Sequence, residues 1–80
     1  MKVIHEEITR RGRLQIVESR SRYGNRWFWR TMNKKGEQLS RSSENYERLQ
    51  SCLRNLVAEK EVMGQLVPIE MIAEHLKIKL

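Results

Sequence analysis

The residues best suited to chemistry form one aromatic and basic run, residues 26–30, which reads Arg-Trp-Phe-Trp-Arg. Alternate residues of an extended strand point to opposite faces of a sheet. We expect Trp27 and Trp29 to face a core. Arg26, Phe28 and Arg30 would then project from the other face. Arginine can contact phosphates and guanine edges, and phenylalanine can stack on an unpaired base, so the pattern indicates nucleic-acid binding.

Further bases flank this strand in the loops on either side. The predicted nucleic-acid-binding residues are Arg20, Arg22, Arg26, Phe28, Arg30, Lys34 and Lys35. The net charge of +6 is uneven, because residues 1–35 carry ten Lys or Arg and three Glu, whereas residues 36–80 carry six bases and seven acids. Such asymmetry is typical of proteins with an anionic partner. A basic surface that serves solubility alone would give the same asymmetry.

Residues that could support catalysis are few. His5 and His75 are the candidate general bases, and each stands alone in sequence. There is no aspartate, no glycine-rich phosphate loop and no nucleophile elbow, and no Cys/His set has zinc-ligand spacing. The single cysteine, Cys52, is expected to be a small residue at the edge of the core rather than a reactive thiol. We therefore expect a protein that is not an enzyme, with no catalytic residues, metal or cofactor.

The candidate site must be positioned by a sheet. Residues 14–18, 26–32 and 37–41 have strand-like composition and are separated by turn residues. They predict a three-stranded antiparallel meander. Residues 3–9 could form another strand, with a turn at residues 11–13.

The pattern then changes to a helical period. Ser42 or Ser43 could cap a helix that ends near Glu61, before Gly64. Its apolar stripe is formed by Tyr46, Leu49, Leu53, Leu56 and Val57. We expect this amphipathic helix to pack on the meander, which makes the protein α+β.

The C-terminal part adds two shorter elements. Residues 65–67 could be a fourth strand, and Pro68 could begin a second helix with Ile69, Ile72, Ala73 and Leu76 on one side. The last four residues, 77–80, could fray or pair as an edge strand. The chain is therefore expected to be one domain, residues 1–80, in three parts. These are an N-terminal strand or extension (1–13), a sheet-helix-strand unit (14–67) and a C-terminal helical segment (68–80).

Several features follow one another along the chain: the run Trp27-Phe28-Trp29-Arg30, a turn that ends in Gly36, then Leu39, Ser42, Tyr46 and a helix. In this order they resemble the YegP-like family of small bacterial proteins. The resemblance implies a unit of three strands, a helix and a last strand, and two such units share one sheet by exchanging the last strands. A homodimer that exchanges residues 66–67 would follow. The turn at residues 33–36, the N-terminal extension and the segment after Pro68 depart from the family pattern. The resemblance implies no activity.

Two other interpretations remain open. The layout of a sheet with Trp and Arg followed by one helix is also similar to the arm-site DNA-binding domain of phage-type integrases. Alternatively, a small basic protein of phage or mobile-element type could occupy an acidic surface on a host protein, since Trp, Tyr and Arg often anchor interfaces. No apolar run approaches the ~20 residues of a membrane helix, so we expect a cytoplasmic protein with no membrane association.

Overall fold

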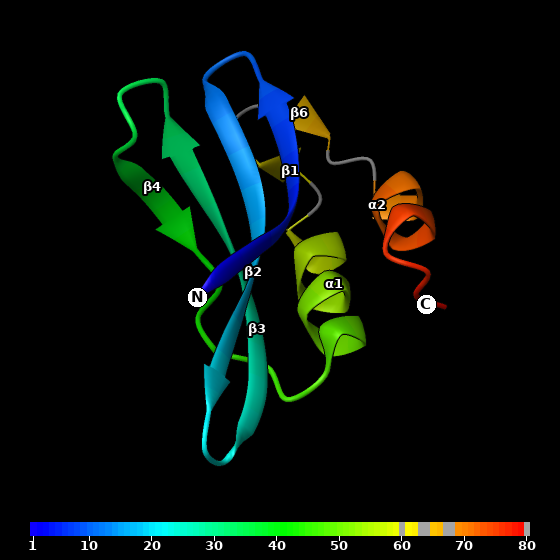
Figure 1. The fold of residues 1–80 in the computed structure, drawn as a ribbon. Helices are drawn as coiled ribbons and strands as arrows, with labels where there is room; N and C mark the ends of the chain where they lie inside the picture. Colours follow the sequence, from blue (N-terminus) through cyan, green and yellow to red (C-terminus); the bar gives the residue numbers. More distant parts are fainter. Residues whose placement is uncertain (60, 63–64, 67–68, 80) are drawn as a thin grey trace.

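The computed structural model describes residues 1–59, 61–62, 65–66 and 69–79 of the chain. Its elements follow one another as β1 (Lys2–Thr9), β2 (Gly12–Ser21), β3 (Gly24–Asn33), β4 (Gln38–Arg41), α1 (Leu49–Ala58), β5 (Glu61–Val62), β6 (Gln65–Leu66) and α2 (Ile69–His75). β1 to β4 form one antiparallel sheet in sequence order, and both helices lie on the same side of it (Figure 1). The α+β class is confirmed.

The expected antiparallel meander is confirmed as β2 to β4, and the strand that residues 3–9 could form joins it as β1, so the sheet has four strands. β1 pairs with β2 from Lys2 opposite Glu18 to Thr9 opposite Gly12. The turn that joins them depends on Gly12, whose φ is +151° and whose added Cβ would lie 1.9 Å from the carbonyl oxygen of Met32. Only a residue without a side chain fits this approach between strands.

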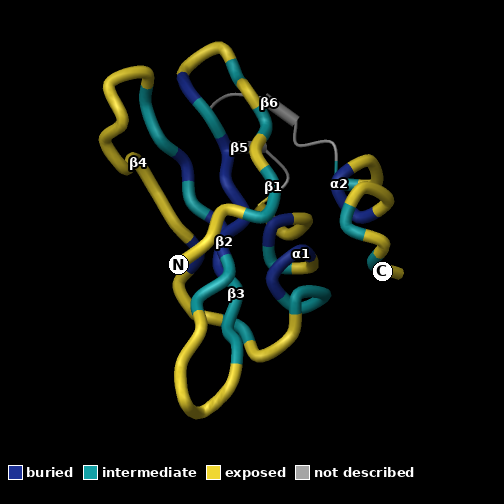
Figure 2. The backbone as a smooth tube through the Cα atoms, viewed as in Figure 1, coloured by how far each residue is buried: buried dark blue, intermediate teal, exposed yellow. Residues whose placement is uncertain are grey.

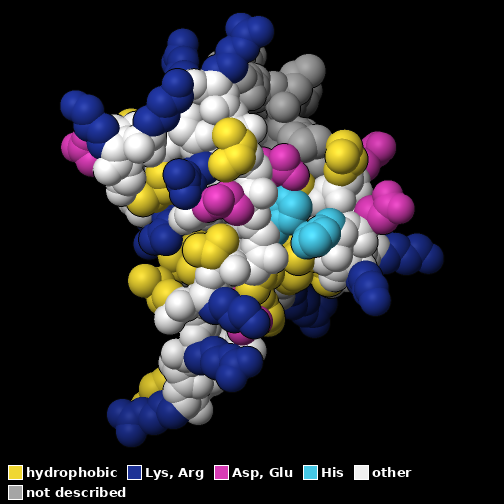
Figure 3. All heavy atoms as spheres, turned by 45° about the horizontal axis from the view of Figure 1, so that its top comes forward, with side chains coloured by type: hydrophobic (Ala, Val, Ile, Leu, Met, Phe, Trp, Pro, Cys, Tyr) yellow, Lys and Arg dark blue, Asp and Glu magenta, His cyan; other side chains and the backbone are white. Residues whose placement is uncertain are grey.

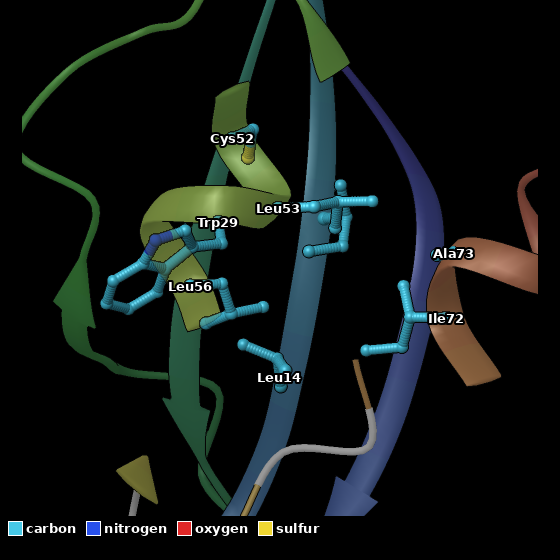
Figure 4. Packing of buried hydrophobic residues seen from close by; sticks show 8 residues of the cluster. Leu14, Trp29, Cys52, Leu53, Leu56, Ile72 and Ala73 are labelled. Atoms are coloured by element: carbon cyan, nitrogen blue, oxygen red, sulfur yellow. The ribbon is translucent and has the colours of Figure 1, made fainter. Parts of the chain in front are cut away.

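The two faces of β3 differ as its alternation predicts. Trp29 lies opposite Ile16 and is 5% exposed, and it joins the core cluster together with Trp27 at its margin. The expectation that both tryptophans face the core is therefore confirmed. The cluster consists of Leu14, Ile16, Trp29, Cys52, Leu53, Leu56, Ile72 and Ala73 (Figure 4). The indole N–H of Trp29 donates to Asn55 Oδ1 on α1 at 2.8 Å, so the buried ring has a partner for its one polar atom.

The first helix begins later than predicted, at Leu49, and neither Ser42 nor Ser43 caps it. The chain after β4 instead runs beside β3. The Ser42 amide donates to the Trp29 carbonyl, and Tyr46 exchanges two backbone hydrogen bonds with Trp27. The Ser42 hydroxyl accepts the Trp29 amide and donates to the carbonyl of Glu44. Pairing the outer edge of β3 satisfies buried backbone groups, and this requirement outweighs the capping preference of serine.

The second helix is confirmed, and it ends differently from the expectation. Lys77 adopts φ +56°, its amide donates to the Glu74 carbonyl, and the Ile78 amide donates to the Ala73 carbonyl. This is a Schellman end, in which the left-handed residue is usually glycine. Residues 77–79 therefore close the helix and form no edge strand.

The predicted fourth strand lies partly outside the described residues, which include neither residue 67 nor residue 68. β6 pairs with β5 of the same chain, as a two-stranded sheet separate from the main one. The exchange of this strand between two chains stays a prediction.

Candidate nucleic-acid interface

One face of the four-stranded sheet is covered by neither α1 nor α2. The strand register places four arginines on it, because side chains directly opposite each other share a face. These are Arg13 on β2, Arg26 and Arg30 on β3, and Arg41 on β4. Among the described strand positions of this face, Glu6 is the one acid. We call this surface the uncovered face.

A row of hydrogen bonds crosses the uncovered face. Arg30 Nε donates to Gln15 Oε1 at 2.8 Å, and Gln15 Nε2 donates to Glu6 Oε2 at 2.7 Å. The same Glu6 oxygen lies 3.5 Å from Arg13 Nη1. Because the bond to Gln15 uses the Nε of Arg30, the row fixes the guanidinium and leaves its two Nη groups to contact a ligand. Glu6 in turn offsets part of the positive charge.

Phe28 is on the predicted face, yet the residue is only 3% exposed. The guanidinium carbon of Arg41 lies 4.2 Å from the ring centroid, in a cation–π contact. Arg41 is held there by bonds to the Ser42 carbonyl and to Asn45 Oδ1. The expected stacking of a base on Phe28 does not fit this arrangement. The ring instead supports an arginine, which takes its place at the surface.

The loop residues of the predicted site separate into two groups. Arg20 and Arg22 lie at the hairpin between β2 and β3, whereas Lys34 and Lys35 lie in the turn after β3. A ten-residue strand at ~3.3 Å per residue puts about 30 Å between these ends. Figure 3 shows Lys and Arg side chains gathered at both ends of the molecule. The predicted residues therefore form a long surface and not one pocket.

Sequence reasoning missed several cations of this surface. Arg10 and Arg11 are exposed in the β1–β2 turn, which lies at the same end of the sheet as Lys34 and Lys35, since Gly12 pairs with Asn33 (Figure 1). Arg13 and Arg41 were missed as well. The alternation of β2 would have found Arg13. Arg41 needs the β3–β4 register, which contains an irregularity between Thr31 and Met32.

The two histidines, which looked isolated in sequence, meet between β1 and α2. Their ring centroids lie 4.9 Å apart, and His5 Nε2 is 2.8 Å from Glu7 Oε1. In the part of the chain that the structure describes, no group of three or more His, Cys, Asp or Glu side chains is placed to hold a metal ion. Cys52 is fully buried, and burial raises the pKa of its thiol to about 12. That environment is typical of a packing residue.

The geometry defines a small α+β protein with a two-helix layer on one side of its sheet and an arginine-bearing face on the other. No protein-family model, curated protein or solved structure matches the chain. The likenesses to YegP-like proteins and to integrase arm-site domains therefore stay predictions. None of the helices within the described residues has the length and apolar character needed to cross a membrane.

Proposed function

We propose that the protein is a non-enzymatic nucleic-acid-binding protein that uses the uncovered face to contact the phosphate backbone. The observation that carries this proposal is the placement of four arginines on a sheet surface that neither helix covers and whose described strand positions hold one acid, Glu6. A second carboxylate, the exposed Glu47 on the chain before α1, lies 3.7 Å from Arg26 Nη2. Lys and Arg neutralise phosphates and release the counterions condensed on them, which supplies most of the sequence-independent affinity for nucleic acid. A cytoplasmic location is part of the proposal.

The cations at the two ends lengthen this surface. The exposed bases at one end are Arg10, Arg11, Lys34 and Lys35, and those at the other are Arg20 and Arg22. A positive field along about 30 Å suits a linear polyanion better than a small anion, which would need its charges gathered in one pocket. Both helices, on the opposite side of the sheet, come from the half of the chain whose six bases and seven acids nearly cancel.

The test is a double charge reversal, Arg26→Glu with Arg30→Glu. Affinity for a labelled mixed-sequence oligonucleotide should fall by more than 100-fold at about 100 mM salt. Arg54→Glu, at an exposed position on α1, is the control for a charge reversal on the other side of the sheet and should lose much less than half of the free energy of binding that the double variant loses. Circular dichroism should show that all variants are folded. Unchanged affinity in the double variant would remove the uncovered face from the account.

A second candidate is an acidic protein surface as the partner, as in a phage- or mobile-element-type protein that modulates a host protein. Large apolar side chains exposed on the edge strands favour it: Ile8 is 72% exposed, Leu39 54% and Val3 39%. Apolar groups beside arginines suit a protein interface better than a phosphate backbone. Capture of one host protein from nuclease-treated lysate, lost in the Ile8→Glu variant, would support this candidate.

A homodimer formed by strand exchange is a separate proposal that rests on the YegP-like resemblance. Light scattering at several protein concentrations tests it. A mass of one chain at every concentration would contradict the exchange, without bearing on nucleic-acid binding.

A further inference from the structure

The hairpin between β2 and β3 projects beyond the rest of the sheet. β1 pairs with β2 only as far as Glu18, and the last backbone pairing of β3 with the chain after β4 is Trp27 with Tyr46. Arg26 Nη2 lies 3.7 Å from Glu47 Oε1 on the chain after β4. Residues 19–25 are therefore a two-stranded ribbon with no strand paired to either edge. We call these residues the hairpin extension. It points away from the helices in Figure 1 and is largely exposed in Figure 2.

The composition of the hairpin extension is unusual for a solvated turn. It reads Ser-Arg-Ser-Arg-Tyr-Gly-Asn, so every residue except the glycine carries a hydrogen-bonding side chain and none is acidic. Arginine pairs with guanine edges, asparagine with adenine edges, and serine with either. The extension thus has the side chains that read bases, and nothing in it would repel phosphates.

Local contacts hold the tip of the hairpin extension in one shape. The Ser21 hydroxyl donates to the Gly24 carbonyl at 3.0 Å and accepts the Tyr23 amide at 3.2 Å. Gly24 has φ +113°, which a side chain would disfavour. The Arg22 guanidinium lies 5.3 Å from the centre of the Tyr23 ring, and Tyr23 is 77% exposed. A tip that is already ordered loses little entropy on binding.

Width decides which part of the sheet can enter a groove. Strands lie ~4.8 Å apart, so the axes of the four-stranded part span about 14 Å before side chains are added. The major groove of B-form DNA is ~12 Å wide and admits a two-stranded ribbon, whereas the minor groove is about half as wide. The hairpin extension fits the major groove. The broad part of the uncovered face must stay outside, with its arginines against phosphates.

The form of the nucleic acid follows from the same features. Single strands are bound by several exposed aromatic rings on which bases stack. Of the described aromatic side chains, Phe28 and Trp29 are buried, Trp27 and Tyr46 are half-buried, and Tyr23 alone is largely exposed. Double-stranded RNA has a major groove too deep and narrow for side chains to read.

We infer that the ligand is double-stranded DNA and that the hairpin extension enters its major groove. The arginines of the uncovered face then contact phosphates of the flanking backbone. This inference rests on the proposed function and names the element that reads the DNA. Arg22 and Tyr23 at the tip are the residues expected to lie deepest in the groove.

The test compares four ligands of one sequence: duplex DNA, its single strand, the matching duplex RNA, and duplex DNA whose cytosines carry bulky glucosylated hydroxymethyl groups in the major groove. We expect plain duplex DNA to bind at least tenfold more tightly than the other three. A netropsin-type occupant of the minor groove should have little effect. The variant Arg22→Ala with Tyr23→Ala should lose about tenfold on plain duplex and no longer distinguish it from the glucosylated one.

The variant Arg22→Lys separates base reading from charge. It should keep the salt dependence of the wild-type protein and lose part of the preference for unmodified DNA, because lysine lacks the flat guanidinium fork. Equal affinity for plain and glucosylated duplex, or wild-type behaviour of the tip variant, would overturn the inference. If Arg26→Glu with Arg30→Glu still abolished binding in that case, the proposed function would stand. If neither Arg22→Ala with Tyr23→Ala nor Arg26→Glu with Arg30→Glu weakened DNA binding, both proposals would be contradicted.

Discussion

Replacing Glu6 by glutamine should strengthen nucleic-acid binding. Damage to the fold would weaken binding, so a gain in affinity must come from the removed charge. Glu6 is the one acid among the described strand positions of the uncovered face, and its carboxylate lies 3.5 Å from Arg13 and accepts Gln15 at 2.7 Å. A glutamine amide oxygen can still accept from Gln15. The Arg13–Glu6 pair is partly exposed, so its loss should lower stability by less than about 1 kcal/mol.

The size of the gain follows from the repulsion that is removed. Arg13 Nη1 lies 3.5 Å from Glu6 Oε2, so a phosphate bound by Arg13 would lie about 7 Å from the Glu6 carboxylate. At that separation two like charges repel by about 0.6 kcal/mol in a water-like dielectric and by about 2.4 kcal/mol at an effective dielectric of 20. Glu6 is 35% exposed, which places it nearer the first value. We therefore expect affinity to rise about three- to tenfold at low salt, with the gain shrinking as salt screens it.

Fluorescence anisotropy with a labelled duplex measures this change. Glu74→Gln on α2 removes the same charge from the opposite side of the sheet and is the matched control. An equal gain in both variants would mean that net charge alone matters. No gain with Glu6→Gln would refute the assignment of the uncovered face as the binding surface.

Three further predictions concern the core that supports this face. Leu56→Ala should lower the free energy of unfolding by about 2–5 kcal/mol in urea titration, whereas Val57→Ala, at a 43%-exposed position, should change it by less than about 1 kcal/mol. Asn55→Ala leaves the Trp29 indole unpaired and should cost about 1–3 kcal/mol, and a double-mutant cycle with Trp29→Phe should show that the two losses are not additive. Because burial raises the Cys52 pKa from 9.0 to about 12, the unfolded chain loses this proton first, and stability should fall as pH rises above about 9. Fast alkylation of Cys52 near pH 8 without denaturant would contradict its buried position.

The alternation of residues 26–32 was enough to predict the core side of β3. Trp27 and Trp29 are apolar and occupy odd-numbered positions, whereas Arg26 and Arg30 are charged and occupy even-numbered ones. One strand register therefore buries both tryptophans and exposes both arginines. The spacing of Leu49, Leu53 and Leu56 predicted α1 for the same reason. The helix start was wrong because Ser42 and Tyr46 pair with β3, a long-range contact that no local preference encodes.

The arrangement of the candidate site was harder to predict. The burial of Phe28 depends on Arg41, thirteen residues later, and on an irregular register that brings its side chain over the ring. The division of the cations between two ends could have been anticipated, since consecutive turns of an antiparallel meander lie at opposite ends of the strands. The hairpin extension could not, because its projection depends on where β1 and the chain after β4 stop pairing.

The salt dependence of duplex binding tests the central claim most directly. If the four arginines of the uncovered face each meet a phosphate, the logarithm of the binding constant should fall linearly with the logarithm of salt concentration. Its slope should be about −3.6 or steeper, because the cations at the two ends of the surface add to it. The slope should flatten by about 0.9 when Arg30 is replaced by alanine. A wild-type slope near zero, or a slope unchanged by Arg30→Ala, would contradict the claim that this face binds nucleic acid.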